Sequence, residues 1–260
     1  MIISAQPDGL RLVTQPDHAH QCAALARAWG NDTFRRIDHW DDLVLATEHH
    51  DDGWKAWDAN PEVDTEGVPI DFPKLDRRVH VDLYSRGVEA VATMSARAGL
   101  VVSRHGQGLY EKRMGLDGEP PPREERPEHE RDFILGQEAL QARLRERLHP
   151  APRPEWEWAA YRLLQTWDVM SLYLTWGLVD RGQPWPLPKV PRSEGDEGVT
   201  VTLAATDDGA SVDPWPFAES ALTVEAPAWT IPNRVYRSPE LRTALSSAAP
   251  QRLRWVLTPA

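Results

Sequence analysis

Cysteine is almost absent from the 260-residue chain, which contains only Cys22. A single cysteine excludes a disulfide framework and a zinc site built from several thiolates. Long apolar runs are also missing, and the N-terminal string M-I-I-S-A-Q-P-D-G lacks the basic start and apolar centre of a secretory signal. We therefore expect a cytoplasmic protein that does not span a membrane.

Basic residues are also few, with 29 Lys and Arg against 40 Asp and Glu and a formal net charge of -11. This balance argues against nucleic acid as a bulk electrostatic partner, and it still permits a small phosphorylated ligand in a local basic pocket. Phenylalanine is scarce at 4 residues, whereas tryptophan reaches 12. Hydrophobic residues make up 41% of the chain, enough for a sizeable core in which we expect most tryptophans to pack.

Helical periodicity dominates the first two thirds of the chain. Apolar residues spaced three and four apart predict helices over residues 14–29, 38–54, 75–98, 132–148 and 154–180. A hairpin is predicted over residues 1–14, strands over 199–205, 221–231 and 253–258, and a short helix over 238–246. We expect a mainly α fold, with residues 1–190 as a helical domain. Residues 191–260 are expected as a small β-rich appendage whose sheet includes the N-terminal hairpin.

The string T-E-H-H-D-D-G-W, residues 47–54, ends one of the predicted helices. At about 100° per residue, His50 and Asp51 flank the apolar side of that helix, whereas His49 and Asp52 point away. An inward carboxylate needs a partner, and a His–Asp pair is a common ligand set for a metal ion. An ordinary helix end with hydrogen-bonded neighbours would satisfy the same pattern.

The same geometric rule selects inward residues on other predicted helices. His18 lies on an apolar stripe while His20 points away from it, and His80 lies on the apolar face of the next long helix. His105 lies over an apolar pair if its segment is helical. Asp168 is the only charged residue between positions 163 and 179, so it needs a cation, hydrogen-bond donors or a metal.

Together these positions define one candidate metal site. Its residues are His18, His50, Asp51, His80, His105 and Asp168. Four histidines and two carboxylates suffice for one or two divalent ions, with positions left open for water and substrate. Imidazole and carboxylate ligands suit iron, manganese or zinc. Each residue alone also fits an ordinary core role.

The order H…HD…H…H…D on a helical frame resembles the HD-domain superfamily of metal-dependent phosphohydrolases, over residues 16–180. The strings Q-P-D-H-A, E-H-H-D-D-G-W and S-R-H-G are similar to a bacterial family of unknown function that is related to that superfamily, and this similarity spans most of the chain. The resemblance implies an HD-domain-like helical bundle. The doubled His49-His50 leaves the register of the HD pair open.

The resemblance also implies roles for the inward residues. A first metal would be held by His18, His50, Asp51 and Asp168, and a second would be completed by His80 and His105. The implied reaction is hydrolysis of a phosphate ester of a small molecule or nucleotide. Asp51 and Arg104 are the expected catalytic residues, with Arg77 and Lys55 as further candidate phosphate anchors.

Two other functions stay open at this point. An HD-fold di-iron oxygenase acting on a small polyol or phosphonate has the same ligand order. A non-catalytic domain with a structural metal, or with an interaction role, is the second alternative.

Overall fold

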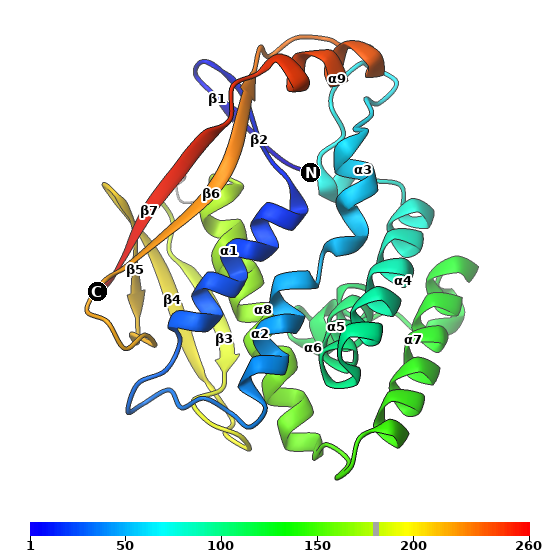
Figure 1. Ribbon diagram of the computed structural model, residues 1–260, viewed down its shortest axis with the longest axis vertical. Coiled ribbons are helices and arrows are strands. Elements are labelled where there is room, and N and C mark those ends of the chain that lie inside the picture. The colour runs from blue at the N-terminus through cyan, green and yellow to red at the C-terminus, as the bar shows by residue number, and fades with distance from the viewer. Residues whose placement is uncertain (179–181) are drawn as a thin grey trace.

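A seven-stranded mixed sheet runs along one side of the molecule, and the helices pack beside it (Figure 1). The computed structural model describes residues 1–178 and 182–260. The strands follow the order β1-β2-β6-β7-β5-β4-β3, in which only β5 and β7 pair in parallel. Their bounds are β1 Ile2–Gln6, β2 Gly9–Val13, β3 Trp185–Val190, β4 Val199–Thr206, β5 Gly209–Asp213, β6 Leu222–Ile231 and β7 Gln251–Pro259.

The expectation of a mainly α fold with a small sheet is wrong, because the sheet is large and the protein is α/β. Two of the strands, β3 and β5, are not predicted by the sequence pattern. Strand β3 contains Pro186 and Pro188. Proline has no backbone N–H to donate to a neighbouring strand, so its presence argues against a strand except at the edge of a sheet. Strand β5 has only five residues and no long apolar alternation. The N-terminal hairpin does join the sheet, through pairing of β2 with β6.

Strand pairing also crosses the expected boundary at residue 190. Strand β3, from the first expected domain, pairs with β4 from the second. The division into residues 1–190 and 191–260 stays a prediction.

The helices lie in successive rows away from the sheet, with α1 and α8 nearest to it and α4 and α7 farthest (Figure 1). Their bounds are α1 Gln15–Ala28, α2 Trp40–His49, α3 Lys55–Ala59, α4 Arg77–Met94, α5 Ala96–Tyr110, α6 Lys112–Gly115, α7 Glu128–Arg147, α8 Pro154–Thr175 and α9 Ser238–Ser247. The predicted helix over 154–180 thus ends at Thr175, and its positions 179 and 180 lie outside the described residues. No helix within the described ranges has both the length and the apolar character needed to cross a bilayer.

The row formed by α1 and α8 is the centre of the core. Trp29, at the C-cap of α1, and Trp167 on α8 are both fully buried, and their rings meet edge to face with centroids 5.6 Å apart. Trp40 of α2 makes a similar contact with Trp167 at 5.5 Å. Edge-to-face aromatic pairs add a directional preference to apolar burial. The core therefore fixes α1, α2 and α8 relative to one another. Helices α1 and α8 carry His18 and Asp168, and the turn after α2 carries His50 and Asp51.

The predicted helix over residues 75–98 is in fact two helices. Helix α4 ends at Met94, and Ser95 caps α5 by accepting hydrogen bonds from the backbone nitrogens of Arg97 and Ala98. Gly99 lies inside α5 and does not end a helix. A Cβ there would approach Ala92 Cα to 2.5 Å, so the glycine allows α4 and α5 to pack closely.

A similar close approach fixes the turn that follows α2. A Cβ on Gly53 would lie 2.0 Å from the carbonyl oxygen of Leu83, and a Cβ on Gly87 would lie 2.9 Å from the Gly53 nitrogen. The backbone of the turn thus touches the backbone of α4 directly. This contact holds the segment that carries His50 and Asp51 against α4.

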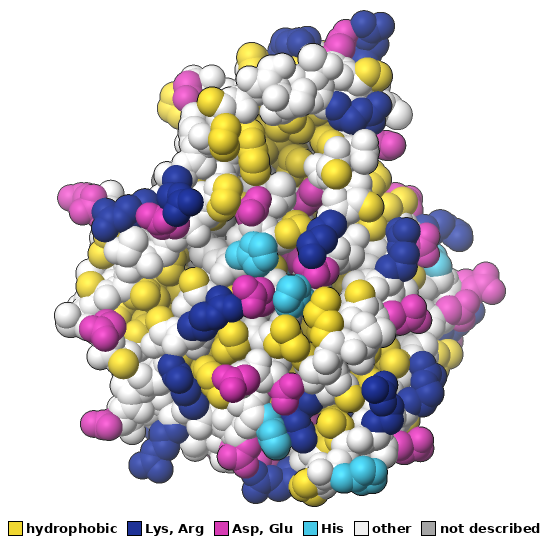
Figure 2. All heavy atoms as spheres, viewed as in Figure 1, with side chains coloured by type: hydrophobic (Ala, Val, Ile, Leu, Met, Phe, Trp, Pro, Cys, Tyr) yellow, Lys and Arg dark blue, Asp and Glu magenta, His cyan; other side chains and the backbone are white. Residues whose placement is uncertain are grey.

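Charged side chains are spread over the molecular surface seen in Figure 2. Lys and Arg are interspersed with Asp and Glu there, and histidine side chains are visible near the middle of this face. This face therefore presents no continuous basic surface of the kind that tracks a phosphate backbone.

Replacing Gly53 with Ala should destabilise the protein, because the added methyl group has no space against Leu83. Overpacking of this kind costs about 1–3 kcal/mol of unfolding free energy. Gly136→Ala is the matched control, because Gly136 is exposed on α7 with nothing within 4 Å of its Cβ position. It should raise stability by about 1 kcal/mol through helix propensity. Chemical denaturation measures both, and equal stability of the two variants would contradict the close contact.

Candidate metal centre

The first residue of the site is His18, in the first turn of α1. Thr14 caps this helix, because its hydroxyl oxygen accepts a hydrogen bond from the backbone nitrogen of Asp17. His18 is buried, and both ring nitrogens face polar atoms of α8. Its Nε2 lies 3.0 Å from Asp168 Oδ1, and its Nδ1 lies 2.7 Å from Ser171 Oγ. The sequence prediction that His18 points inward and His20 outward is confirmed by their burial.

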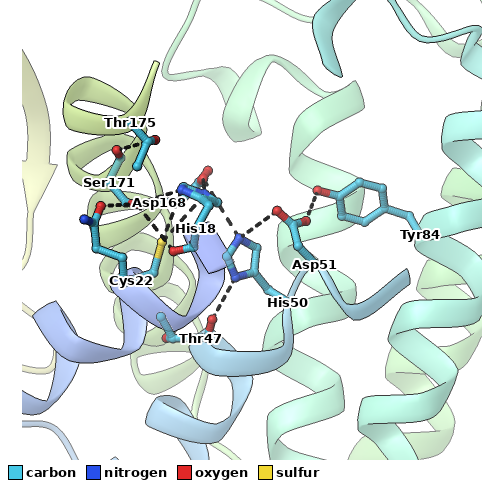
Figure 3. A network of polar contacts seen from close by, with 10 residues as sticks. His18, Cys22, Thr47, His50, Asp51, Tyr84, Asp168, Ser171 and Thr175 are labelled. Carbon is cyan, nitrogen blue, oxygen red and sulfur yellow. Dashed lines mark hydrogen bonds and ion pairs between the residues drawn. The ribbon is translucent and has the colours of Figure 1, made fainter. Parts of the chain in front are cut away.

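His50 and Asp51 occupy the turn between α2 and the short 3-10 helix Asp52–Trp54. His50 Nδ1 donates to the carbonyl oxygen of Thr47 at 2.8 Å. Its Nε2 points the other way, 3.4 Å from Asp51 Oδ2 and 4.0 Å from Asp168 Oδ1. Figure 3 shows these side chains from α1, α2 and α8 converging, with Tyr84 of α4 donating to Asp51 Oδ1 at 2.7 Å.

The two neighbouring His–Asp pairs of this segment have different surroundings. His49 and Asp52 form a separate pair at 2.9 Å, and Lys55 joins it at 2.8 Å from Asp52 Oδ2. These residues lie away from Asp168. His50 and Asp51 are therefore the inward pair, as the helical wheel predicts.

His105 completes the inner group from α5. It is fully buried, and its ring centroid lies 5.1 Å from that of His50, which in turn lies 5.7 Å from that of His18. The Nδ1 of His105 has no hydrogen-bond partner among the described residues. Three imidazoles and two carboxylates, from three helices and one turn, thus share one buried volume.

The hydrogen bonds fix which nitrogen of each ring carries a proton. A backbone carbonyl only accepts, so His50 Nδ1 must carry its hydrogen and Nε2 keeps a lone pair in the neutral ring. The Ser171 hydroxyl donates to Gln21 Oε1 at 2.7 Å, which leaves its oxygen to accept from His18 Nδ1. In the neutral rings, both Nε2 lone pairs therefore face the Asp168 carboxylate. Such an arrangement requires a proton or a cation between these atoms.

A metal ion fits the observed spacing. Ligand atoms about 2.1 Å from one ion lie about 3–4.2 Å from each other, and the distances from Nε2 of His18 and His50 to the carboxylate oxygens span 3.0–4.0 Å. His50 Nε2 is buried and has no hydrogen-bond partner among the described residues. A metal-binding histidine usually donates its other ring N–H to a carbonyl or hydroxyl oxygen, which fixes the orientation of the ring. The donors His18, His50, Asp51 and Asp168 thus suit a divalent ion.

Burial and neighbouring charges have opposite effects on the pKa values of Asp168 and His50. Burial alone would raise the pKa of Asp168, but the neighbouring His18, His105 and His50 hold it well below its ordinary value. Burial lowers the pKa of His105 to about 3, so that ring stays neutral. For His50 burial acts to lower the pKa, and the carboxylates of Asp51 and Asp168 outweigh it and raise the pKa. A permanent anion therefore faces at least one neutral imidazole.

Cys22 lies beside the cluster, one helical turn after His18. Its Sγ is 3.7 Å from His18 Nε2, and ligand atoms of His18, Cys22 and His50 all lie within 4.8 Å of one another. Burial, followed by the charge of Asp168, raises the pKa of the thiol well above its ordinary value. Cys22 therefore contributes a neutral thiol in this state. The signal in the sequence that places Cys22 near His18 is their spacing of four residues, which puts both on one face of a helix.

A cavity of about 250 Å³ opens over the cluster. His18, Asp51, His105 and Asp168 form one side of it, and His80 contributes to the other. His80 Nδ1 lies 2.6 Å from Tyr110 Oη, and its ring lies 4.7 Å from that of Tyr84. Burial, followed by the charge of Arg77, lowers the pKa of His80 to about 3. His80 therefore faces the cavity as a neutral side chain, held by Tyr110.

The three proposed phosphate anchors have different surroundings. Arg77 lines the cavity, is half exposed and contacts Glu130 at 2.9 Å. Arg104 is not in the lining and instead contacts Glu157 at 3.3 Å. Lys55 is also outside the lining and pairs with Asp52.

Sequence reasoning missed three polar residues of the lining, Gln15, Tyr84 and Arg113. Tyr84 lies four residues after His80 on the same face of α4, so the helical period places both toward the cavity. Arg113 follows α5 at a residue with φ of 50°, in the left-handed region, and no periodic pattern extends through such a turn.

The fold and the cluster define an α/β protein with a buried His/Asp centre between its helices. The chain belongs to the family described as "Protein of unknown function (DUF3891)", whose model matches residues 1–233. Neither a search of curated proteins nor a search of solved structures finds a match. Membership of an uncharacterised family is therefore confirmed.

We expect His18 and His50 to be Nδ1–H tautomers in the metal-free protein when both rings are neutral. The reason is that Ser171 Oγ and Thr47 O accept from those nitrogens. Long-range ¹H–¹⁵N correlation spectra of histidine side chains measure the tautomer, with exposed His20 as the internal reference. An Nε2–H tautomer at either residue would remove the basis for a shared cation site.

Proposed function

We propose that the protein is a metal-dependent hydrolase of phosphate esters, related to the HD-domain phosphohydrolases. One observation carries the proposal: Nε2 of His18 and Nε2 of His50 converge on two buried carboxylates beside a cavity. The ligand order along the chain is the one that the HD resemblance implies. The histidines and carboxylates come from α1, the turn after α2, α5 and α8, which agrees with a helical HD frame even though a large sheet lies beside it.

One ion is the simplest occupant of this centre. His18, His50, Asp51 and Asp168 would hold it, and Tyr84 orients Asp51 by donating to its other oxygen. A bound divalent ion supplies Lewis acidity toward a phosphoryl oxygen and lowers the pKa of water toward neutrality. We assign His80 to the substrate side, because its Nδ1 is held by Tyr110.

The remaining lining residues suit a phosphoryl group. Arg77 and Arg113 bring guanidinium groups to the cavity, and planar guanidinium groups bind phosphate through paired hydrogen bonds. His105 adds a neutral imidazole with an unpartnered nitrogen. Trp54, Phe72 and Leu75 close the apolar part of the cavity and limit access of bulk water. A cavity of about 250 Å³ favours a small phosphoryl-bearing group at this point.

The decisive test compares two neighbouring carboxylates. Asp51→Asn and Asp168→Asn keep the side-chain shape and remove a ligand charge, so both should lose bound metal and phosphodiesterase or phosphatase activity. Asp52→Asn is the matched control, because Asp52 pairs with His49 and Lys55 outside the centre. Elemental analysis after loading with Mn²⁺, Fe²⁺ or Zn²⁺ measures the metal, and release of p-nitrophenol from its phosphate esters measures the activity.

Three results would contradict the proposal. Asp52→Asn losing metal as completely as Asp168→Asn would place the ion elsewhere. If the protein binds metal but hydrolyses no ester, the result would favour the non-catalytic alternative, in which the metal is structural or the domain has an interaction role. Oxygen uptake by an iron-loaded protein, with no ester hydrolysis, would favour the oxygenase alternative.

The hydrogen bond between His18 Nδ1 and Ser171 gives a separate prediction. Ser171→Ala removes the acceptor of His18 Nδ1–H, and loss of such a partner lowers metal affinity by about 10- to 100-fold. Thr175→Val is the control, since Thr175 is equally buried one turn along α8 and its hydroxyl donates only to Ser171 O. Competition with a fluorescent zinc chelator measures both affinities. Equal affinities would show that His18 does not ligate the ion through Nε2.

A further inference from the structure

A second and larger cavity, of about 730 Å³, lies on another side of α8. Gln165, Thr166 and Val169 line it from α8, and strand β3 forms a facing wall. Asp168 and Leu172 line only the smaller metal cavity, so α8 separates the two hollows. Arg113 lines both cavities, and they therefore adjoin at that residue.

The floor of the larger cavity holds a buried guanidinium group. Arg162 is 4% exposed, and no carboxylate of the described residues lies within 4.0 Å of its nitrogens. It donates to the carbonyl oxygens of Pro188 and Lys189 and to Gln165 Oε1. Burial lowers the pKa of Arg162 to about 10, which still leaves it cationic at neutral pH. A buried cation without a counter-charge is costly.

Gln165 adds an unused donor at the same place. An arginine has no acceptor, so Gln165 must turn its oxygen toward Arg162, where the distance from Nη1 is 2.6 Å. Its amide nitrogen is consequently directed elsewhere, and this buried Nε2 has no hydrogen-bond partner among the described residues. Gln165 is 1% exposed in a helix packed on all sides. An unpaired donor beside a cation that has no carboxylate partner among the described residues indicates a place for an anionic acceptor.

Apolar side chains make up part of the remaining wall. Val169, Leu178 and Leu187 line it, and so does Trp185, with 40% of its surface exposed. Asp117 is the single carboxylate among the described lining residues; it is exposed and lies 3.4 Å from Arg113. The described lining thus contains two guanidinium groups and one carboxylate, beside both polar and apolar side chains.

We propose that this cavity binds an organic anion, with its charged group at Arg162 and Gln165 and an apolar or aromatic body against Trp185 and the β3 wall. The charged group is a carboxylate, sulfonate or phosphate, which share the required acceptor oxygens. The competing role for Arg162 is purely structural, as a tie between α8 and the β3 carbonyls. Binding here needs no metal and stands whether or not the hydrolase proposal holds.

A pair of fluorescent probes of similar shape tests the proposal. 1-Anilinonaphthalene-8-sulfonate carries the anion, and N-phenyl-1-naphthylamine lacks it. The native protein should bind one equivalent of the sulfonate about 10- to 100-fold more tightly than the neutral probe, because a hydrogen bond to a charged group is stronger. Binding of both probes with equal affinity, or of neither, would overturn the proposal.

Gln165→Glu separates the binding role from the structural one. The new carboxylate would compensate Arg162 and repel an anion, so sulfonate affinity should fall about 10- to 100-fold while the neutral probe is unaffected. Gln251→Glu makes the same chemical change at an exposed residue of β7 and should change neither. Unchanged sulfonate binding by a folded Gln165→Glu protein would leave Arg162 as a structural tie only.

Trp185→Ala is an independent variant that does not disturb the buried pair. This substitution should weaken the binding of both probes, because both are expected to contact the apolar wall. Sulfate, at ionic strength held constant with chloride, should displace the sulfonate probe and not the neutral one. If Trp185→Ala binds both probes as the native protein does, the probes bind elsewhere and the proposal fails, even if Gln165→Glu does not fold.

Discussion

The need to balance one buried carboxylate organises this structure. Asp168 is the only charged residue between positions 163 and 175 of α8, and its Oδ1 faces the ring nitrogens of His18 and His50. An ionised carboxylate in such surroundings is tolerated only with a compensating charge or several donors. Helix α1, the turn after α2, and α5 all bring an imidazole to it. The packing of these elements and the chemistry of the centre therefore depend on the same charge.

The hydrogen bonds around the centre are arranged to keep the acceptor side of each ring free. Thr47 and Ser171 accept from Nδ1 of His50 and His18, so both Nε2 atoms turn inward. A core that only had to hide polar groups would pair these nitrogens with donors. The unpartnered nitrogens of His50 and His105 are instead retained in the interior, at a cost in stability that a bound cation would offset.

The helical period is sufficient to predict the inward side of His18, His50 and Asp51, because a residue's direction on a helix follows from its position. Asp168 is predicted on a different ground, as the only charged residue in an apolar stretch. The neighbour that a side chain meets depends on packing between helices, which explains why Arg104 pairs with Glu157 and why His80 pairs with Tyr110. The extent of the sheet was missed for a different reason. Prolines in β3 and the shortness of β5 conceal these two strands, and one of the two partners of β5 is β7, from a distant part of the chain.

The pairing of the first hairpin with β6 has a consequence for the order of folding. Leu10 of β2 pairs with Ile231, so this part of the sheet cannot close until nearly the whole chain has been synthesised. Helix α1 follows that hairpin directly and packs against β6, and α1 carries His18. Contacts between distant segments form slowly, because the entropy of closing a long loop must be met before the contact is made. The helices can associate early, but His18 acquires its final position only when the sheet is complete. Maturation of the centre is thus coupled to a late step in folding.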